Sequence, residues 1–520
     1  MSDATLTSYE QIPYVSDPVH GTHPDTLASM ATLFGLNPPP FETGRILELG
    51  CGTGGNLITI ADSLPQSRCI GIDLSPSHIA AGREVIRSLE LNNVELRAGS
   101  ILGIGDDWGR FDYIICHGVY SWVPPNIQDH ILGICSRNLA PHGVAYVSYN
   151  VYPGWHFAGM IRDMVNFHGR RYPEPRERIA QARHFLDFLT GLVERDPDNS
   201  LYHGVLANQV EDLRSDRDAY LFHEYLEEVN LPVYFHEFAA RATAKGLQFL
   251  SETHIAAMAG TLPNDVKEVL HGWSNGIVEY EQYIDFVRNR RFRKTLLCHA
   301  GEAVCHEPGP EVMRRFRFIG YAQPKSAVPD PSPTGTDQFQ MPTGSTWSTN
   351  NPWMRAAARA AWAASPRSLS FAELAQQVNG ALPDGVSPDE SRLTQALFQA
   401  VLSGLMEFHL FEPAFVAALS ERPIATPLAR VQLRNGNRVT NRRHHSVEMD
   451  ALHRQVLTAL DGSRDRNALV ELLTDLVREG MPLVDENGQS VSEPNHVREV
   501  LGRAIDAALT RFARGAMLVG

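Results

Sequence analysis

The sequence lacks the features of membrane and secreted proteins. No apolar run approaches the ~20 residues that cross a bilayer, and no basic stretch followed by an apolar one opens the chain. The six cysteines are few for 520 residues and scattered, which is typical of a reducing compartment. These absences predict a cytoplasmic protein with no membrane partner.

Positive charge is also scarce. The chain has 46 Lys and Arg against 60 Asp and Glu, a formal net charge of -14. A large nucleic-acid footprint needs a basic surface, so no nucleic-acid partner is expected. An acidic surface suits a cationic, lysine-rich partner, although acidity equally serves solubility.

The length exceeds what one hydrophobic core supports, which predicts several domains. Residues 1–157 alternate strands with helices after an N-terminal arm, and residues 158–322 have mainly helical periodicity. Residues 323–351 are rich in Pro, Ser, Thr and Gly and predict a linker. Residues 352–520 follow as a C-terminal domain, in which helix, turn, helix and an alternating strand over 353–412 predict a winged helix.

The most informative stretch runs from Ile46 to Asn56 and reads ILELGCGTGGN. An apolar strand leads into an acid, three alternating glycines form a turn, and a helix begins. Arg68 to Ser75 reads RCIGIDLS, a second apolar strand that ends in an acid. This strand, turn, helix and strand are typical of a site for an adenosine-containing cofactor at the carboxyl edge of a parallel sheet.

The acid before the glycines indicates which cofactor is bound. A dinucleotide site would show G-x-G-x-x-G and aim a helix N-terminus at a pyrophosphate. Glu48 would repel that anion, whereas it suits a ligand with an ammonium group and a sulfonium. Further strands expected at 94–98, 111–116 and 143–150, with a helix at 128–139, predict a doubly wound parallel sheet.

The pattern E-x-G-x-G-x-G resembles motif I of the class I S-adenosylmethionine (SAM) methyltransferases. By that resemblance the glycines let the backbone approach the cofactor, Glu48 lies beneath its amino-acid end, and Asp73 binds the ribose hydroxyls. The predicted cofactor-binding residues are Glu48, Gly50, Cys51, Gly52, Gly54, Asn56, Asp73, Leu74, Gly99, Ser100, Ile101, His117 and Tyr14.

Segments outside motif I extend the resemblance to nearly the whole chain. They read YEQIPY with THP, CHGVYSWVP, NVYPGWH, RNRRFRKTLLCH and LDGSRDR. Together they resemble bacterial class I methyltransferases with a methyltransferase regulatory domain, a family that includes rickettsial protein lysine methyltransferases acting on outer-membrane proteins. The resemblance implies an α/β, doubly wound Rossmann-like core, a helical middle domain, a winged-helix-like C-terminal domain, and SAM as cofactor with S-adenosyl-L-homocysteine as product.

The acceptor site is predicted after the fourth strand. Methyl transfer is an in-line displacement at an activated carbon, so the enzyme mainly positions the reactants. A lysine acceptor must also lose a proton from a pKa of about 10.4. Tyr120 and His117 are the predicted catalytic residues, Tyr120 as a wall of the acceptor pocket and His117 as a base. The predicted substrate-binding residues are Tyr120, Trp122, Trp155 and His156.

Each of these residues also has a purely structural interpretation, as a packed loop aromatic or a hydrogen-bonded histidine. Tyr14, His20 and His23 are predicted either to cover the cofactor or to anchor the N-terminal arm. No metal is expected, because the two Cys-His pairs at 298–299 and 305–306 lack the usual C-x2-4-C spacing. The basic run 288–294 indicates a solvated helix face or, less simply, a grip on an acidic partner.

The leading function is transfer of a methyl group to a protein acceptor at lysine. The alternative is a small-molecule N- or O-methyltransferase that uses the extra domains as a lid or as a homodimer platform. The absence of N-P-P-Y after the fourth strand argues against nucleobase or amide acceptors. A DNA-binding regulator is disfavoured because the candidate recognition helix, 388–403, carries Asp389 and Glu390 but only Arg392 as a base.

Overall fold

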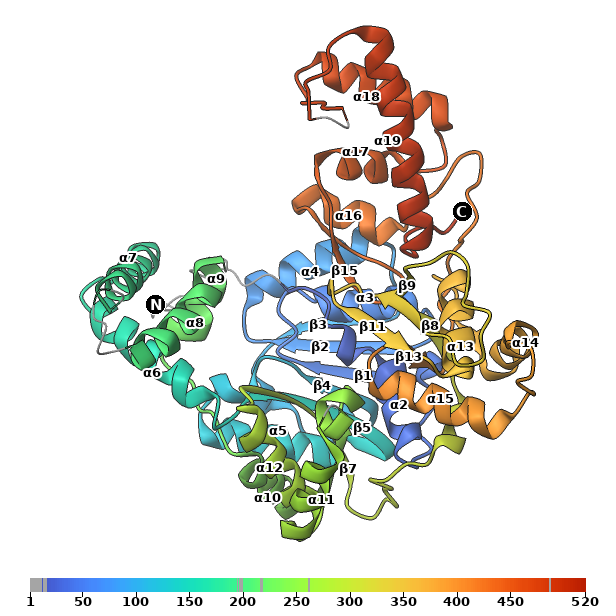
Figure 1. Ribbon diagram of the computed structural model, residues 1–520. Helices are drawn as coiled ribbons and strands as arrows, with labels where there is room; N and C mark the ends of the chain where they lie inside the picture. Colours follow the sequence, from blue (N-terminus) through green and yellow to red (C-terminus); the bar gives the residue numbers. More distant parts are fainter. Residues whose placement is uncertain are drawn as a thin grey trace.

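The structure is a computed structural model that describes residues 12, 16–193, 195, 200–215, 218–260, 262–485 and 488–520. Tyr14, a predicted cofactor contact, lies outside the described residues. A seven-stranded sheet occupies the centre of the molecule (Figure 1), in the order β3-β2-β1-β4-β5-β7-β6. Its strands are β1 Arg45–Leu49, β2 Arg68–Asp73, β3 Val94–Ala98, β4 Phe111–Cys116, β5 Leu139–Asn150, β6 Leu247–Glu252 and β7 Phe292–His299.

The sheet is mixed: the five strands expected within 46–150 pair in parallel as predicted, and antiparallel pairing begins beyond them, at β7. β7 lies antiparallel to both β5 and β6, while β1 to β5 pair in parallel. Two strands, β6 and β7, come from residues 158–322, so the sheet continues past the expected boundary at 157. β7 escaped prediction because its first half is charged, and Arg293 within it is fully buried.

Helices cover both faces of the sheet. Alternate strand residues such as Ile46 and Ile115 join a core with α2 (Pro24–Leu33) and α3 (Gly55–Ser63). The intervening residues, such as Leu47, pack with α5 (Pro125–Arg137) and α10 (Phe235–Ala244). Further helices are α4 Pro76–Ser88, α11 Asn264–Trp273 and α12 Ile277–Arg288. This two-sided covering is the doubly wound arrangement that the sequence predicts.

A helical group with its own apolar core follows β5. It comprises α6 Trp155–Gly169, α7 Pro175–Val193, α8 Ser200–Ser215 and α9 Asp218–Leu221, and it stands beside the sheet on the left of Figure 1. The predicted linker at 323–351 instead contains a three-stranded antiparallel sheet of β9 Gln323–Pro324, β10 Asp337–Gln340 and β11 Thr346–Thr349. Phe339 and Asp337 anchor this sheet, since Phe339 is fully buried and Asp337 pairs with Arg359 at 2.6 Å.

The remainder forms two units. The first combines α13 Pro352–Ala364, α14 Phe371–Ala381 and α15 Glu390–Leu402 with a small sheet of β8 Arg317–Gly320, β12 Leu369–Ser370 and β13 Met406–His409. The second, at the top of Figure 1, has a separate core and contains α16 Pro427–Asn435, β14 Arg438–Thr440, β15 Ser446–Glu448, α17 Ala451–Ala459, α18 Arg466–Arg478 and α19 Pro494–Arg514. Within the described ranges no helix is long and apolar enough to cross a membrane.

Candidate active site

The glycine turn between β1 and α3 has the backbone that its sequence demands. Gly50, Gly52 and Gly54 have φ of +72°, +55° and +77°, the left-handed region that favours glycine. A Cβ on Gly50 would lie 2.4 Å from Val119 Cγ2, and one on Gly54 would lie 2.8 Å from Leu96 Cδ1. The turn is therefore closely packed and leaves its backbone near the carboxyl ends of β1 and β4.

Asp73 lies across from this turn at the end of β2. Its Oδ2 accepts a hydrogen bond from Gly52 N at 2.8 Å, and its Oδ1 accepts one from Ser75 N at 2.9 Å. The next residue, Leu74, exposes 64% of its surface, although it is a large apolar side chain. A fixed carboxylate beside an exposed apolar side chain suits the hydroxyls and the ring of an adenosine.

The end of β3 lies against the same edge of the sheet. Gly99 N donates to Asp73 O at 2.9 Å, and Ser100 Oγ caps the short helix that begins at Ile101 by accepting from Leu102 N. Ile101 is half-buried and Ser100 is exposed. The structure thus brings the predicted residues at the ends of β1, β2 and β3 together.

Glu48 is buried beneath the turn. Its Oε1 accepts a hydrogen bond from Asn56 Nδ2 at 2.7 Å, whereas its buried Oε2 has no hydrogen-bond partner in the described part of the chain. Burial raises the pKa of Glu48 to about 8, against the opposing effect of the Asn56 hydrogen bond. A buried carboxylate with an unsatisfied oxygen fits the ammonium group of SAM. The neighbouring Cys51 is buried, and burial raises the pKa of its thiol far above the usual value.

Asn56 links this site to both ends of the chain. Its Oδ1 accepts from Val19 N and from Thr22 Oγ1, both at 3.0 Å, and lies 2.9 Å from His444 Nε2. His444 belongs to the turn between β14 and β15, 388 residues away in sequence. Sequence reasoning missed His444 and Val19 as supports of the site, since no local pattern marks such a distant contact.

The N-terminal arm lies directly against the glycine turn. Ser16 Oγ accepts from Gly55 N at 3.2 Å, and a Cβ on Gly55 would come within 1.7 Å of Ser16 O. His23 and His20 point elsewhere, however. His23 caps α2 and lies 3.0 Å from Ser63 Oγ, while His20 faces Glu407. These two contacts favour the anchoring interpretation of the two histidines over a cover for the cofactor.

His117 follows β4 at the predicted position and is half-buried. Its Nδ1 lies 2.8 Å from Tyr146 Oη and 3.2 Å from Ser148 Oγ. Burial, with a smaller effect of Lys294, lowers the pKa of His117 to about 4, so the imidazole is neutral near pH 7. A neutral ring held through Nδ1 is suited to orienting a reactant rather than to holding a proton.

Two of the predicted acceptor residues are packed in cores. Tyr120 is fully buried, with ring centroids 5.2 Å from Phe238 and 5.8 Å from Tyr149, and burial raises its pKa to about 12. Trp155 is only 4% exposed and lies in the core of the helical group. This packing corrects the expectation that the two side chains are open to an acceptor, because neither presents a free surface.

Trp122 and His156 remain accessible. Trp122 is half-buried and meets Trp155 edge to face at 6.4 Å. His156 is exposed and stacks on Tyr152 at 4.3 Å. These two residues stay the predicted acceptor contacts.

The basic run at 288–294 has neither of its predicted roles, because it is engaged internally. Arg293 is fully buried and pairs with Glu252 at 2.7 Å and with Asp285 at 2.8 Å, while Arg290 pairs with Asp285 at 3.2 Å. The run therefore fixes β7 against β6 and α12. Of the Cys-His pairs, Cys298 is buried in β7, and His306 stacks on Phe249 at 5.8 Å.

The sheet order with its antiparallel β7, the left-handed glycines and the unsatisfied Glu48 define a class I SAM-dependent methyltransferase. Family models agree along the chain. They match a methyltransferase domain at 46–143, a predicted methyltransferase regulatory domain at 217–299, and a PKMT C-terminal winged helix domain at 421–517. The winged helix is thus matched downstream of 353–412, the segment whose pattern predicted it.

Relatives share this organisation over the full length. The protein RP789 of Rickettsia prowazekii (strain Madrid E) is 34% identical over 524 residues, covering 98% of this chain and 93% of that protein. The structure of PKMT2 from Rickettsia typhi in complex with AdoHcy covers 98% of this chain and 100% of its own, at 31% identity and a TM-score of 0.86. A second structure of PKMT2 gives a TM-score of 0.87 at 30% identity. The chain belongs to this family of regulatory-domain, PKMT-type methyltransferases, and its cofactor is SAM.

Proposed function

We propose that this methyltransferase modifies a protein, at the side-chain amine of lysine. The observation that supports this most is the extent of the likeness to PKMT2. It includes the helical group, the unit of α13, α14 and α15 with the sheet of β8, β12 and β13, and the winged helix, all of which lie outside the cofactor site. Large accessory surfaces suit a macromolecular acceptor, and a net charge of -14 suits a lysine-rich one.

The chemistry fits an amine acceptor. SAM, when bound, supplies a methyl group activated by its sulfonium. The chain's part is to hold the acceptor nitrogen in line, with its lone pair free. With Nδ1–H donating to the Tyr146 hydroxyl oxygen, His117 keeps an Nε2 lone pair that accepts a hydrogen bond from the amine. Trp122 and His156 are the proposed walls of the acceptor channel, in which the face of Trp122 would attract the lysine ammonium before it loses its proton.

The proposal predicts methylated protein. Purified enzyme is incubated with methyl-labelled SAM and a bacterial lysate, and the protein and small-molecule fractions are counted separately. The expected result is label on protein, located on lysine by mass spectrometry and lost in the Gly52→Arg variant. Label confined to small molecules would refute a protein acceptor and favour an N- or O-methyltransferase of small compounds. A cytoplasmic location and a homodimer stay predictions, tested by fractionation and by light scattering.

A further inference from the structure

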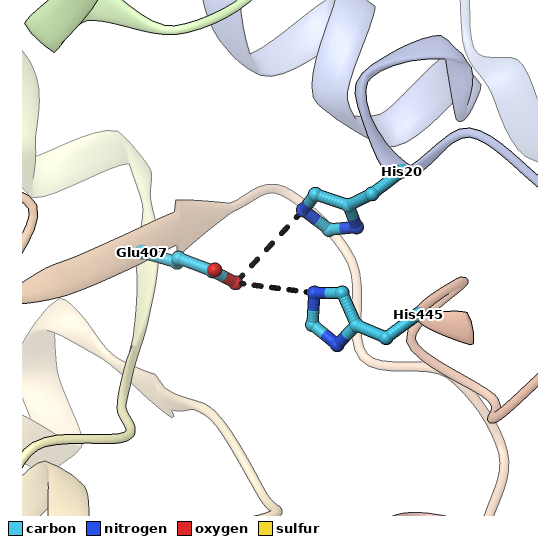
Figure 2. A group of neighbouring side chains, drawn as sticks. All are labelled: His20, Glu407 and His445. Carbon is cyan, nitrogen blue, oxygen red and sulfur yellow. Dashed lines mark ion pairs between the residues drawn. The ribbon is translucent and has the colours of Figure 1, made fainter. Parts of the chain in front are cut away.

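Three histidines and a glutamate meet where three distant parts of the chain join. The N-terminal arm supplies His20, β13 supplies Glu407 and His409, and the turn between β14 and β15 supplies His445. Figure 2 shows His20, Glu407 and His445 pointing toward one another from separate segments. Nε2 of His20 and Nε2 of His445 each lie 4.0 Å from Glu407 Oε2.

The hydrogen bond at the outer side of the His20 ring is that of a metal-binding histidine. His20 Nδ1 lies 3.2 Å from the carbonyl oxygen of Arg443, so an Nδ1–H donates to it and leaves the Nε2 lone pair facing Glu407. In metal sites such a bond from the second nitrogen to a carbonyl or carboxylate fixes the tautomer and the ring.

A third histidine, His409, lies close to the carboxylate. His409 Nδ1 lies 2.7 Å from Asp25 Oδ2, and its Nε2 lies 3.6 Å from Glu407 Oε2. His409 exposes only 8% of its side chain. Neither His409 Nε2 nor Glu407 Oε2 has a hydrogen-bond partner among the residues that the structure describes. Two buried polar atoms that face one place without a bond require an explanation.

We propose that His20, Glu407 and His445 bind a divalent transition metal ion, with Zn²⁺ as the best fit, and that His409 positions the carboxylate. Two imidazoles and a carboxylate form a ligand set that zinc accepts, with water in the fourth position. Bonds of about 2.0–2.1 Å in a tetrahedral site separate ligand atoms by about 3.4 Å. The observed 4.0 Å closes to that distance through small side-chain movements.

The ion would join the arm and the winged helix beside the cofactor site. Val19 precedes His20 and donates to Asn56, and His444 precedes His445 and contacts the same Asn56 oxygen. Asn56 in turn holds Glu48. A bound ion would therefore stabilise the floor of the SAM site without touching SAM.

The test uses the full-length, tag-free protein after treatment with a chelator. Zn²⁺ is titrated by calorimetry, and Co²⁺ uptake is followed by its visible absorption. We expect one Zn²⁺ per chain, a Co²⁺ spectrum typical of four-coordinate nitrogen and oxygen ligands, and a higher melting temperature with Zn²⁺. Glu407→Gln and His445→Gln should each weaken Zn²⁺ binding by roughly 100-fold or more, since ligands matter more than their outer partners.

Two variants serve as controls. His496→Gln removes a half-exposed histidine from α19, and Cys305→Ser removes an exposed thiol. Both should bind Zn²⁺ like the wild type. Wild-type protein that takes up neither Zn²⁺ nor Co²⁺ would overturn the proposal, as would uptake that Glu407→Gln and His445→Gln leave unchanged. Circular dichroism checks that the variants fold, and the wild-type Co²⁺ result stands apart from them. None of these readouts requires a methyl acceptor.

Discussion

The cofactor side and the acceptor side of the active site differ in how they are built. On the cofactor side, Glu48, Gly52, Asn56 and Asp73 lie within 26 residues and form two direct hydrogen bonds, between Asn56 and Glu48 and between Gly52 and Asp73. On the acceptor side, His117 depends on Tyr146 and Ser148 from β5, and it faces Phe292 from β7 at 6.1 Å. A short motif can specify the first arrangement, whereas strand pairing across the sheet must assemble the second.

The largest effect expected on the cofactor side comes from Gly52→Arg. Gly52 has φ of +55°, and among the described residues only Ser16 approaches the position of its Cβ, so an arginine would extend into the cofactor's place. Calorimetry should show SAM affinity reduced by roughly 100-fold or more, about 3 kcal/mol. Gly404→Arg is the matched control, because Gly404 has a similar left-handed φ of +70° and no described residue beyond its chain neighbours lies within 4 Å of its Cβ position. Equal losses in both variants would attribute the effect to strain alone.

The next effect concerns how the stability of the ligand-free protein depends on pH. Glu48 has its pKa raised from 4.5 to about 8, so the folded chain holds a proton that the unfolded chain releases. Below pH 4.5 Glu48 is protonated in both states, and the folded protein keeps its full stability. As the pH rises from 4.5 to about 8, the unfolded chain releases this proton while the folded chain keeps it, so the free energy of unfolding falls. Glu48→Gln should therefore gain stability over the wild type between about pH 5 and pH 8, on the order of a few kcal/mol.

Thermal unfolding at several pH values measures this difference. The control is Glu84→Gln, which changes an exposed carboxylate of α4 and should track the wild type at every pH. A Glu48→Gln curve parallel to the wild type would mean that Glu48 ionises in the folded protein as an ordinary carboxylate.

Comparing the binding of SAM with that of adenosine, which lacks the amino-acid part of SAM, should distinguish the roles of Glu48 and Asp73. Asp73→Asn should lower the affinity for both SAM and adenosine by roughly 10-fold or more, since hydrogen bonds to a charged group contribute about 1.5–3 kcal/mol. Glu48→Gln should weaken SAM to a similar extent but leave adenosine unaffected, because adenosine has no ammonium group. Calorimetry with the two ligands gives both values, and equal losses of adenosine binding in the two variants would contradict the assignment of Glu48.

A smaller effect should come from the C-terminal winged helix. His444→Ala removes the contact between His444 Nε2 and Asn56 Oδ1 at 2.9 Å. A hydrogen bond of about 1 kcal/mol predicts SAM binding weakened about 5-fold. His496→Ala, in the same domain but on its surface, should bind SAM normally. Unchanged SAM binding in His444→Ala would show that the winged helix does not support the cofactor side through this contact.

The smallest effect is expected at Tyr120 on the acceptor side. Tyr120→Phe keeps the ring contacts with Phe238 and Tyr149, so kcat should stay within about 3-fold of the wild type. His117→Ala should lower kcat by roughly 10-fold or more, because the acceptor nitrogen loses the group that orients it. Steady-state kinetics with an unmethylated form of a protein that the enzyme methylates provides both numbers. A large loss in Tyr120→Phe would restore the predicted catalytic role of its hydroxyl.

The sequence alone determined the central part of the cofactor side, because the contacts of Asn56 with Glu48 and of Gly52 with Asp73 are local. Left-handed glycines, a buried acid and an acid at the next strand end are fixed by residue type and spacing. It also predicted helices on both faces of the sheet, through alternation and periodicity. It could not show that β7 runs antiparallel, because the charge of Arg293 is satisfied by Glu252, Glu281 and Asp285, which lie on other elements.

Tertiary structure alone decided which aromatic residues are buried and which distant segments support the site. Tyr120 and Trp155 lie in cores because Phe238 and the helical group pack on them, and no local pattern specifies those partners. The meeting of Asn56 with His444, and of His20 with Glu407 and His445, joins segments nearly 400 residues apart. Such contacts form only when separately folded units dock, since side-chain spacing along the chain does not constrain them.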